Sequence, residues 1–497
     1  MKSGLKKISL FIALLNAYNV AGKTELPNIL LILVDDMGYG DLGTCNSKSK
    51  IPTPNMDRLA DEGIRFSNAY CPASVSTPSR YSLMTGQYSW RTSKKGGVMA
   101  NYQPSLIEKG RLTLPKMLQQ AGYETAGIGK WHLGTEFHTI DGKKPIGYGK
   151  FQDDNNGANL DFSQPVIGGP TEHGFDFWLG ISCASECWIL KNNRIMGAIK
   201  HEIYTTPTLP QNDEYKRIQL VDYLPFITEQ SINYIKARSE KKNDKPFFLY
   251  FTPYAPHIPL MVSPEFLGKT KAGYYADYVH ELDHYIGQVI NILDSLGLAD
   301  NTLVLLASDN GSQFISTSPE DDPTKVSNSL SAVNKEIRPN AHHPNFPYSG
   351  TKWSISEGGL RTPLIARWPG HFPKGKTSDQ LIVLNDIMPT IATLIGTTLP
   401  SNAAEDGVSL LPAFYGKKVG KGARESVVLQ SNGGQLAIRW GKWKFIEEKT
   451  VSNEKKLKQE LYDLSVDPGE TKNLISEEPV IAIKMQEMLQ EIKTQSK

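Results

Sequence analysis

Four short runs of apolar residues have the character of strands that are buried on both faces. They are Asn28–Val34, Thr125–Gly129, Pro246–Phe251 and Thr302–Ala307. The stretches between them include three helical patterns, at Asn55–Glu62, Thr113–Ala121 and Ala276–Leu296. Continuous apolar strands that alternate with helices are typical of parallel sheets covered on both sides. The pattern therefore predicts an α/β fold in which helices sandwich a large mixed, mainly parallel sheet.

Polar residues follow each of the four predicted strands. In chain order they are Asp35 and Asp36, Lys130 and His132, His257, and finally Asp309 and Asn310. Ligands of open α/β sheets bind in the crevice beyond the carboxyl ends of the strands. Turn formation would explain any one of these pairs. Because all four strand ends carry such groups, we expect them to converge on one polar site.

The acidic part of this site has the chemistry of a divalent-cation site. Its candidate ligands are all hard oxygen donors: Asp35, Asp36, Asp309 and Asn310. Such ligands suit Ca²⁺ or Mg²⁺ better than zinc. Clustered carboxylates repel one another, so a cation or several basic side chains must accompany them. Candidates for these basic side chains are Arg80, Lys130 and Lys352.

Composition narrows the class of protein. The 497 residues include 54 Lys and Arg against 52 Asp and Glu, a formal charge of +2. This balance excludes the broad cationic surface that drives non-specific nucleic-acid binding, and we expect no nucleic-acid partner. With 8 Trp, 21 Tyr and 17 Phe, the chain has ample material for a folded core.

The first 22 residues have the pattern of a signal peptide. Three lysines precede the short apolar stretch Ile8–Leu15, and small residues suited to cleavage follow at Ala21 and Gly22. The stretch is shorter than the roughly 20 apolar residues that span a bilayer, although a buried N-terminal helix is an alternative. We expect an exported protein, periplasmic or secreted in a bacterium, without a membrane anchor.

Residues 76–86 read STPSRYSLMTG and predict a helix N-terminus. Pro78 suits the first turn of a helix, which would place Ser76 at the N-cap and Arg80 about one turn further on. A helix N-terminus beside an arginine favours anion binding. Taken alone, however, Ser76 is better explained as an ordinary capping residue.

The same segment resembles the maturation signature S-x-P-S-R of type I sulfatases, which belong to the alkaline phosphatase-like superfamily. Further blocks match in family order: NILLILVDDMGYGDLG at 28–43, TPNMDRLADEGIRFSNAY at 53–70, GIGKWHLG at 127–134, LASDNGS at 306–312, GTKWSISEGGLRTPLIARWPG at 350–370 and ELYDLSVDPGETKNL at 460–474. The resemblance thus extends from residue 28 to residue 474, and it is to the serine-type variant of the family.

This resemblance implies a set of roles. A maturation enzyme that accepts serine would oxidise Ser76 to formylglycine. One Ca²⁺ would be bound by Asp35, Asp36, Ser76, Asp309 and Asn310. The groups around the sulfate would be Arg80, Lys130, His132, His257 and Lys352. A hydroxyl of the formylglycine hydrate would attack the sulfur, with His257 or Lys352 placed to protonate the leaving alcohol, His257 being preferred, and His132 as the later base.

The implied substrate is a sulfate ester, expected to be an O-sulfated sugar of host or algal glycans. Two alternatives remain open. One is a phosphoryl or phosphonate ester hydrolase of the same superfamily, which a two-metal site would favour. The other is a non-catalytic protein that binds sulfated glycans and keeps Ser76 unmodified.

A competing motif lies at residues 280–284, where HELDH satisfies the zinc-protease pattern H-E-x-x-H. The two histidines flank an apolar stripe at helical spacing that includes Val279, Leu282 and Ile286. No third histidine follows at the short spacing of several zinc-protease families. We therefore interpret the segment as an ordinary packed helix.

The remaining segments define domains and loops. We expect a catalytic domain at 25–415 and a C-terminal subdomain at 416–497 with a small antiparallel sheet and a closing helix at Pro479–Ile492. Long loops at 135–175 and 312–349, with the Cys183–Trp188 region, are expected to shape substrate selection. The four cysteines allow either two disulfides or free thiols, and the sequence leaves this open.

Overall fold

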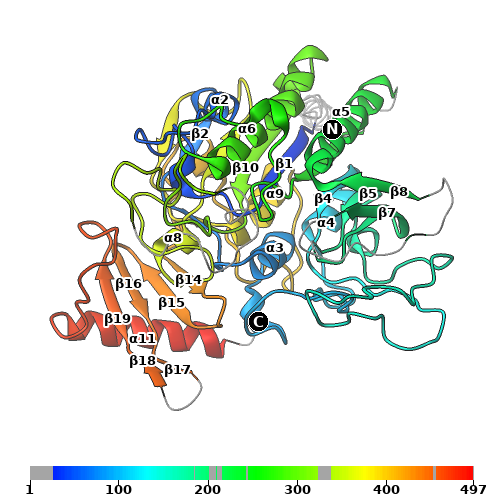
Figure 1. Ribbon diagram of the computed structural model, residues 1–497. Coiled ribbons are helices and arrows are strands. Elements are labelled where there is room, and N and C mark those ends of the chain that lie inside the picture. Colours follow the sequence, from blue (N-terminus) through cyan, green and yellow to red (C-terminus); the bar gives the residue numbers. More distant parts are fainter. Residues whose placement is uncertain are drawn as a thin grey trace, which may run out of the picture.

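A mixed sheet of eleven strands forms the centre of the protein in the computed structural model (Figure 1). The structure describes residues 26–183, 185–200, 209, 215–241, 245–322, 337–451 and 455–495, so the predicted signal peptide lies outside the described residues. In spatial order the strands are β12 (Lys376–Ser378), β2 (Ile64–Phe66), β11 (Leu364–Arg367), β10 (Thr302–Ser308), β1 (Asn28–Val34), β9 (Phe247–Thr252), β4 (Glu124–Lys130), β5 (Phe177–Ile181), β6 (Trp188–Lys191), β7 (Arg194–Lys200) and β8 (Lys216–Gln219).

The middle of this sheet is parallel. β10, β1, β9, β4 and β5 run in one direction, whereas β11 and β6 on either side are antiparallel to their inner neighbours. The four strands predicted from the sequence are the four adjacent strands β10, β1, β9 and β4. The prediction of a mainly parallel mixed sheet is confirmed, and the adjacency places all four carboxyl ends at the same edge.

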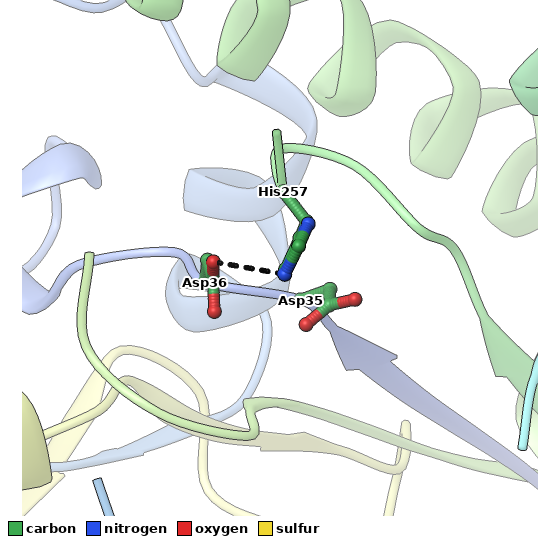
Figure 2. Close-up of side chains that lie close together, drawn as sticks. All are labelled: Asp35, Asp36 and His257. Atoms are coloured by element: carbon green, nitrogen blue, oxygen red, sulfur yellow. Dashed lines mark ion pairs between the residues drawn. The ribbon is translucent and has the colours of Figure 1, made fainter. Parts of the chain in front are cut away.

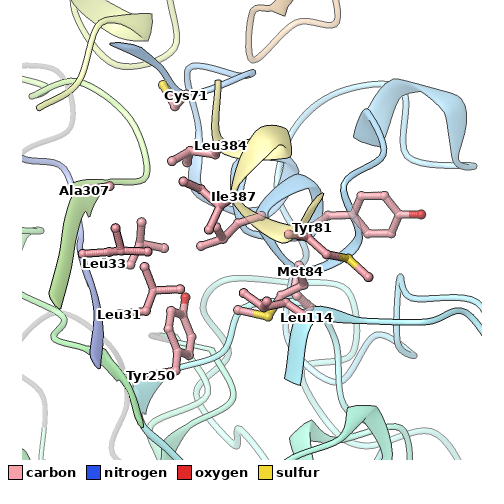
Figure 3. Packing of buried hydrophobic residues seen from close by; sticks show 14 of the residues in the cluster. Leu31, Leu33, Cys71, Tyr81, Met84, Leu114, Tyr250, Ala307, Leu384 and Ile387 are labelled. Carbon is pink, nitrogen blue, oxygen red and sulfur yellow. The ribbon is translucent and has the colours of Figure 1, made fainter. Parts of the chain in front are cut away.

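Both faces of the central strands are buried, which explains why they are apolar throughout. In β1, Ile29, Leu31 and Leu33 pack into one core cluster, while the alternate residues Leu30, Ile32 and Val34 pack into the other. Figure 3 shows Leu31 and Leu33 on the side of β1 that faces the helix-borne Ile387, which belongs to the same cluster. Burial of each such side chain stabilises the fold by roughly 1.5–3 kcal/mol.

Helices cover the two faces. α2 (Pro54–Asp61), α5 (Leu220–Glu240) and α6 (Tyr274–Ser295) contribute to the cluster that contains Leu30. α3 (Ser76–Thr85), α4 (Leu114–Gln120) and α9 (Ile387–Leu394) contribute to the opposite cluster. The three helices predicted from periodicity are α2, α4 and α6, with ends that differ from the prediction by at most two residues. The Thr113 side chain caps α4 by accepting a hydrogen bond from the Lys116 N–H.

A second, antiparallel sheet follows in the C-terminal part of the chain. It consists of β14 (Ser426–Gln430), β15 (Leu436–Trp440), β16 (Trp443–Ile446) and β19 (Glu460–Asp463). Helix α11 (Pro479–Thr494) packs on it through Met485 and Leu489, which share a core with Ile438 and Phe445 (Figure 1). The small antiparallel sheet and closing helix are as predicted.

Short elements complete the chain. They are the helices α8 (Glu357–Leu360) and α10 (Leu411–Phe414), the two-stranded pairs β3 (Ala69–Tyr70) with β13 (Ile382–Val383) and β17 (Lys449–Val451) with β18 (Lys455–Leu457), and the 3₁₀ turns η1 (Tyr39–Asp41), η2 (Ser89–Arg91), η3 (Pro170–His173), η4 (Pro264–Phe266), η5 (Ala299–Asn301) and η6 (Leu384–Asp386). None of the helices in the described ranges is long and apolar enough to cross a membrane.

Candidate active site

The carboxyl ends of β1 and β10 bring the predicted acidic residues into contact. The Asp36 N–H donates to Asp309 Oδ1 at 3.2 Å, and Asn310 Nδ2 donates to Asp36 Oδ1 at 2.6 Å. Asp35, Asp36, Asp309 and Asn310 are each at most 1% exposed. The parallel register pairs Val34 with Ser308, so both strands deliver their next residues to the same place. The expected convergence of these four side chains is observed.

Ser76 lies at the start of α3 and faces this acidic group. Its hydroxyl donates to Asp35 Oδ1 at 3.1 Å and lies 3.5 Å from Asn310 Oδ1. The predicted N-cap position is wrong by one residue, because the extended residue Val75 is the N-cap and Ser76 is the first helical residue. The Ser76 hydroxyl therefore makes no capping bond, which leaves it available to the site.

Three basic side chains neutralise the three carboxylates. The ion pairs are Lys130 Nζ to Asp35 at 2.5 Å, Lys352 Nζ to Asp36 at 2.6 Å, and Arg80 Nη2 to Asp309 at 2.8 Å. Arg80 is held in place by further donation to the Lys130 carbonyl and to the Thr252 hydroxyl. The three basic groups expected to oppose the carboxylates are thus brought together with them, and the partners Lys130 and Lys352 face a cavity.

Negative charge is nevertheless crowded here. Burial and the neighbouring Asp35 carboxylate raise the pKa of Asp309, although Arg80 and Lys130 oppose this shift. A raised carboxyl pKa means that a further positive charge would stabilise the ionised form. Oxygen donors from Asp35, Asp36 and Asp309, together with the Asn310 amide and the Ser76 position, therefore fit a hard divalent cation.

His132 follows β4, and its two ring nitrogens differ in their hydrogen bonding. Its Nε2 lies 3.1 Å from the Met99 carbonyl, which can only accept, so the proton belongs on Nε2. The buried Nδ1 has no hydrogen-bond partner among the described residues. Burial, with Lys130 and Arg80 nearby, lowers the pKa of His132 well below its ordinary value, so the neutral ring presents a lone pair at Nδ1.

His257 follows β9, and its ring points toward Asp36 (Figure 2). Its Nδ1 lies 2.5 Å from the Ile258 carbonyl, and its Nε2 lies 3.7 Å from Asp36 Oδ2. Burial and Lys352 lower the pKa of His257 well below its ordinary value, against the opposing effect of Asp36. Within the described part of the chain, Asp35, Asp36 and His257 form the single group of three or more metal-competent acidic, His or Cys side chains.

Three of the non-glycine residues with positive φ lie at this site. Asp36, His132 and Trp353 have φ angles of +66°, +62° and +75°, in the left-handed region that non-glycine residues rarely adopt. Such conformations cost on the order of 1–3 kcal/mol each, and they persist where surrounding structure enforces them at functional sites. The three strained residues mark the ends of β1 and β4 and the residue after Lys352.

A cavity of about 820 Å³ opens over these groups, within the size range of small-ligand sites. The residues expected from the sequence that line it are Ser76, Lys130, His132, His257 and Lys352, with Cys183 and Ser185 from the 183–188 region and Phe151 and Gln152 from the loop 135–175. None of the described residues of the second predicted loop, 312–322 and 337–349, lines it. Those residues instead contribute to a separate cavity beside Lys48 and Phe346.

Several lining residues were not anticipated. They are Val75, Lys94, Gly97, Val98, Ile258, Trp353 and Asn432. The sequence offered a hint for two of them: Trp353 follows the predicted site residue Lys352, and Lys94 lies in the basic, glycine-containing segment SKKGG. Asn432 had none, because it reaches the cavity from the turn between β14 and β15.

The competing motif is a structural helix, as interpreted. His280 bonds to the Pro52 carbonyl, His284 bonds to Gln288, and the buried Glu281 accepts from the Ser263 N–H. All four cysteines lie in the described part of the chain, and each is a free thiol. Of the two arrangements that the sequence left open, the structure has the free thiols.

Comparison with known proteins identifies relatives over nearly the whole chain. Residues 27–397 match the family model described as Sulfatase, and residues 351–497 match that described as N-sulphoglucosamine sulphohydrolase, C-terminal. An N-acetylgalactosamine-6-O-sulfatase of Bacteroides thetaiotaomicron is 31% identical, covering 95% of this chain and 94% of its own. The human N-acetylgalactosamine-6-sulfatase is 32% identical over 79% of this chain and 67% of its own.

A solved structure supports the same relationship. It is a sulfatase from work on glycosaminoglycan metabolism by Bacteroides thetaiotaomicron, and it superimposes with a TM-score of 0.78 at 29% identity. The superposition covers 95% of this chain and all of that one. The likeness therefore includes the central sheet and the C-terminal sheet together.

Proposed function

The chain belongs to the sulfatase family and is a sulfuric ester hydrolase, and from that premise we propose that it removes sulfate from O-sulfated sugars at the site formed by Ser76 and the four strand ends. One observation carries the assignment of the site. Ser76 lines the cavity, and its hydroxyl lies within 3.5 Å of Asp35 and Asn310, while three lysines and two histidines line the same cavity.

The residues of the site are suited to a calcium ion and to a formylglycine made from Ser76, neither of which the sequence encodes directly. Asp35, Asp36, Asp309, Asn310 and the position of Ser76 would hold one calcium ion, which supplies a fixed positive charge for sulfate oxygens and lowers the pKa of a nearby hydroxyl. Oxidation of Ser76 to formylglycine would supply, in the hydrated form, a pair of geminal hydroxyls as the nucleophile for a sulfate ester. A maturation enzyme that accepts serine is the partner required.

The basic residues hold the transferring sulfate group. Lys130 and Lys352 line the cavity next to Ser76, and their carboxylate partners fix each ammonium in place. Arg80 is fully buried between Asp309 and the Thr252 hydroxyl, so its charge is oriented before substrate arrives. Donors that are preorganised in this way stabilise developing charge without reorganisation, typically by about 10²–10³ in rate for each donor.

The two histidines divide the proton transfers. His132 and Ser76 line the same cavity, and the unprotonated Nδ1 of His132 has no hydrogen-bond partner among the described residues, so this atom is our candidate to accept a proton from a hydroxyl at position 76. His257 has Nδ1 directed at the Ile258 carbonyl, so the proton of the neutral ring lies on Nδ1. Its Nε2 would give a proton to the departing alcohol from the doubly protonated ring, which the negative charge of a bound sulfate would favour. Lys352 approaches the same Asp36 carboxylate as His257 and is the alternative donor of this proton.

The relatives suggest where to start with substrates. Two of them carry N-acetylgalactosamine-6-sulfatase activity in their names, one from a bacterium and one from human. We therefore propose 6-O-sulfated N-acetylgalactosamine as the first sugar to test. The signal-peptide pattern of residues 1–22 supports the proposal that the protein acts outside the cytoplasm.

The decisive test compares Ser76→Ala with Ser82→Ala. Ser82 is buried on the same helix and does not line the cavity. We expect Ser76→Ala to abolish turnover of a sulfated sugar while binding persists, and Ser82→Ala to retain turnover. Mass spectrometry of the native Ser76 peptide should show the loss of two hydrogens. Turnover by Ser76→Ala would refute the assignment of this residue.

A further inference from the structure

The wall of the active-site cavity carries positive charge without acidic side chains. Three lysines and two histidines line it, and its other lining residues are neutral: Val75, Ser76, Gly97, Val98, Phe151, Gln152, Cys183, Ser185, Ile258, Trp353 and Asn432. Two of the lysines, Lys130 and Lys352, are paired with Asp35 and Asp36 beneath them. The third, Lys94, belongs to no such pair.

Lys94 is half-buried, and its ammonium forms no hydrogen bond or ion pair within the described part of the chain. Its Cε and Nζ lie beside Gly97, each 3.9 Å from the point where a Cβ on that glycine would stand. Burial lowers the pKa of Lys94, and no acidic neighbour opposes the shift. A partly desolvated cation of this kind is unfavourable by itself, and a bound anion would relieve the cost.

The loop that carries Lys94 is anchored at several points. The Gly97 N–H donates to the Asn432 carbonyl at 2.7 Å, Gln430 Nε2 donates to the Lys95 carbonyl at 2.9 Å, and the Met99 N–H donates to the Thr77 hydroxyl at 3.0 Å. The loop is thereby fastened both to helix α3 and to the C-terminal sheet. Its fixed backbone keeps Lys94 at the cavity wall.

We propose that Lys94 binds a second anionic group of the substrate, so that the enzyme selects sugars that carry a further negative charge beyond the sulfate that is removed. This inference rests on the proposed function, because it takes the cavity to be the sugar site. Lys94 comes from the loop after η2, whereas the sulfate-holding groups Arg80, Lys130 and Lys352 come from α3, the end of β4 and the loop before α8. Phe151, which is 46% exposed, adds an apolar surface on the cavity wall for a sugar ring.

Two sources of the second charge share this chemistry. One is a second sulfate on the same sugar, and the other is the carboxylate of an adjoining uronic acid. The probes that separate them are N-acetylgalactosamine 6-sulfate, N-acetylgalactosamine 4,6-disulfate, and a disaccharide of a uronic acid with 6-sulfated N-acetylgalactosamine. The first carries a single charge and serves as the reference.

Binding of the three probes is measured by calorimetry on full-length, calcium-loaded Ser76→Ala protein, with and without Lys94→Met. We expect Lys94→Met to weaken binding of one or both doubly charged probes by about tenfold, and to change binding of the monosulfated probe by less than about twofold. Lys94→Arg should restore most of the lost affinity. Lys95→Met is the matched control, because Lys95 is exposed, lies outside the cavity lining and changes the net charge equally.

Equal losses for all three probes, no loss for any, or no binding of either doubly charged probe would each overturn the inference. Failure of the proposed function is a separate result. It would appear as no turnover of any sulfate ester, including a simple aryl sulfate, by matured wild-type enzyme. Aryl sulfate turnover combined with an unresponsive Lys94→Met variant would reject the role of Lys94 alone.

Discussion

Two clusters of buried charge in this protein have similar composition but different surroundings. The strand-end cluster joins Asp35, Asp36, Asp309 and Asn310 to Arg80, Lys130, Lys352 and His257. The inter-sheet cluster lies between the main sheet region and the C-terminal sheet, and it consists of Tyr70, Glu357, Arg361, Arg439, Lys444 and Glu470. In both, carboxylates that are almost wholly buried pair with lysine and arginine.

The two clusters differ in whether their charged side chains are enclosed by protein or border the active-site cavity. In the inter-sheet cluster Lys444 is buried completely, 3.0 Å from Glu357 and 2.7 Å from Glu470, and it also donates to the Ile355 carbonyl. No member of that cluster lines the active-site cavity. In the strand-end cluster, Lys130, Lys352 and His257 line the cavity. Similar ion pairs thus lie enclosed between two sheets in one place and beside a cavity in the other.

The largest expected effect comes from removing a lysine at the strand ends. Lys352→Met should lower kcat/KM by about three orders of magnitude, because a charge aimed at the sulfate is lost. The free energy of unfolding, measured with calcium present, should change by no more than about 1 kcal/mol, since the bound cation would compensate the charge of the Asp36 carboxylate. Steady-state kinetics and urea denaturation on the same preparation provide both values. A variant that unfolds readily yet keeps its kcat/KM would reverse the contrast between the two clusters.

Removing the central lysine of the inter-sheet cluster should do the opposite. Lys444→Met leaves two buried carboxylates without their shared partner, so we expect a loss of about 3–5 kcal/mol in stability and a kcat/KM within about twofold of wild type. The control is Lys442→Met, whose pair with Asp463 is solvent-exposed at the lysine and should contribute less than about 1 kcal/mol. Denaturation midpoints that are equal for the two variants would contradict the structural role of Lys444.

A smaller effect is expected in the pH dependence of stability, where a buried carboxyl without an ion pair should differ from one that has ion pairs. Burial raises the pKa of Glu186 to about 7, and its bonds with Ser182 and the Tyr102 N–H only partly oppose this. Its stabilising contribution is therefore complete below pH 4.5, its ordinary pKa, and is lost as the pH rises through 7. Glu186→Gln should remove up to about 3 kcal/mol of pH dependence between these values.

Glu357 should behave with the opposite sign. Burial alone would raise its pKa, but Lys444, Arg361 and Arg439 together lower it below the ordinary value of 4.5. Its contribution is present above pH 4.5 and is lost as the pH falls through the lowered pKa. Urea denaturation of Glu186→Gln and Glu357→Gln across pH 3 to 8 measures both slopes. Identical pH profiles for the two variants would show that pairing does not control these carboxyls.

Much of the fold could be read from the sequence because its signals are local. The apolar runs at 28–34 and 302–307 are strands buried on both faces, and their polar successors Asp35 and Asp309 meet because parallel strands end at one edge. The helix at Ser76 was predicted, but its cap was misplaced by one residue. Pro78 is tolerated throughout the first turn, where backbone N–H groups lack helical partners, so it does not fix the first residue.

The residues by themselves thus determined the α/β class, the approximate ends of the main strands and helices, and which polar groups meet at the strand ends. Only the tertiary structure decided what those groups face. Asn432 reaches the cavity from the turn between β14 and β15. Lys94 has no counter-ion among the residues that the structure describes, and Lys444 pairs with Glu357, 87 positions away in the chain. Such contacts join distant segments without any periodic pattern, because they depend on how two sheets pack and on where that packing leaves space. Whether a buried charge stabilises the fold or remains available to a substrate is set by that arrangement.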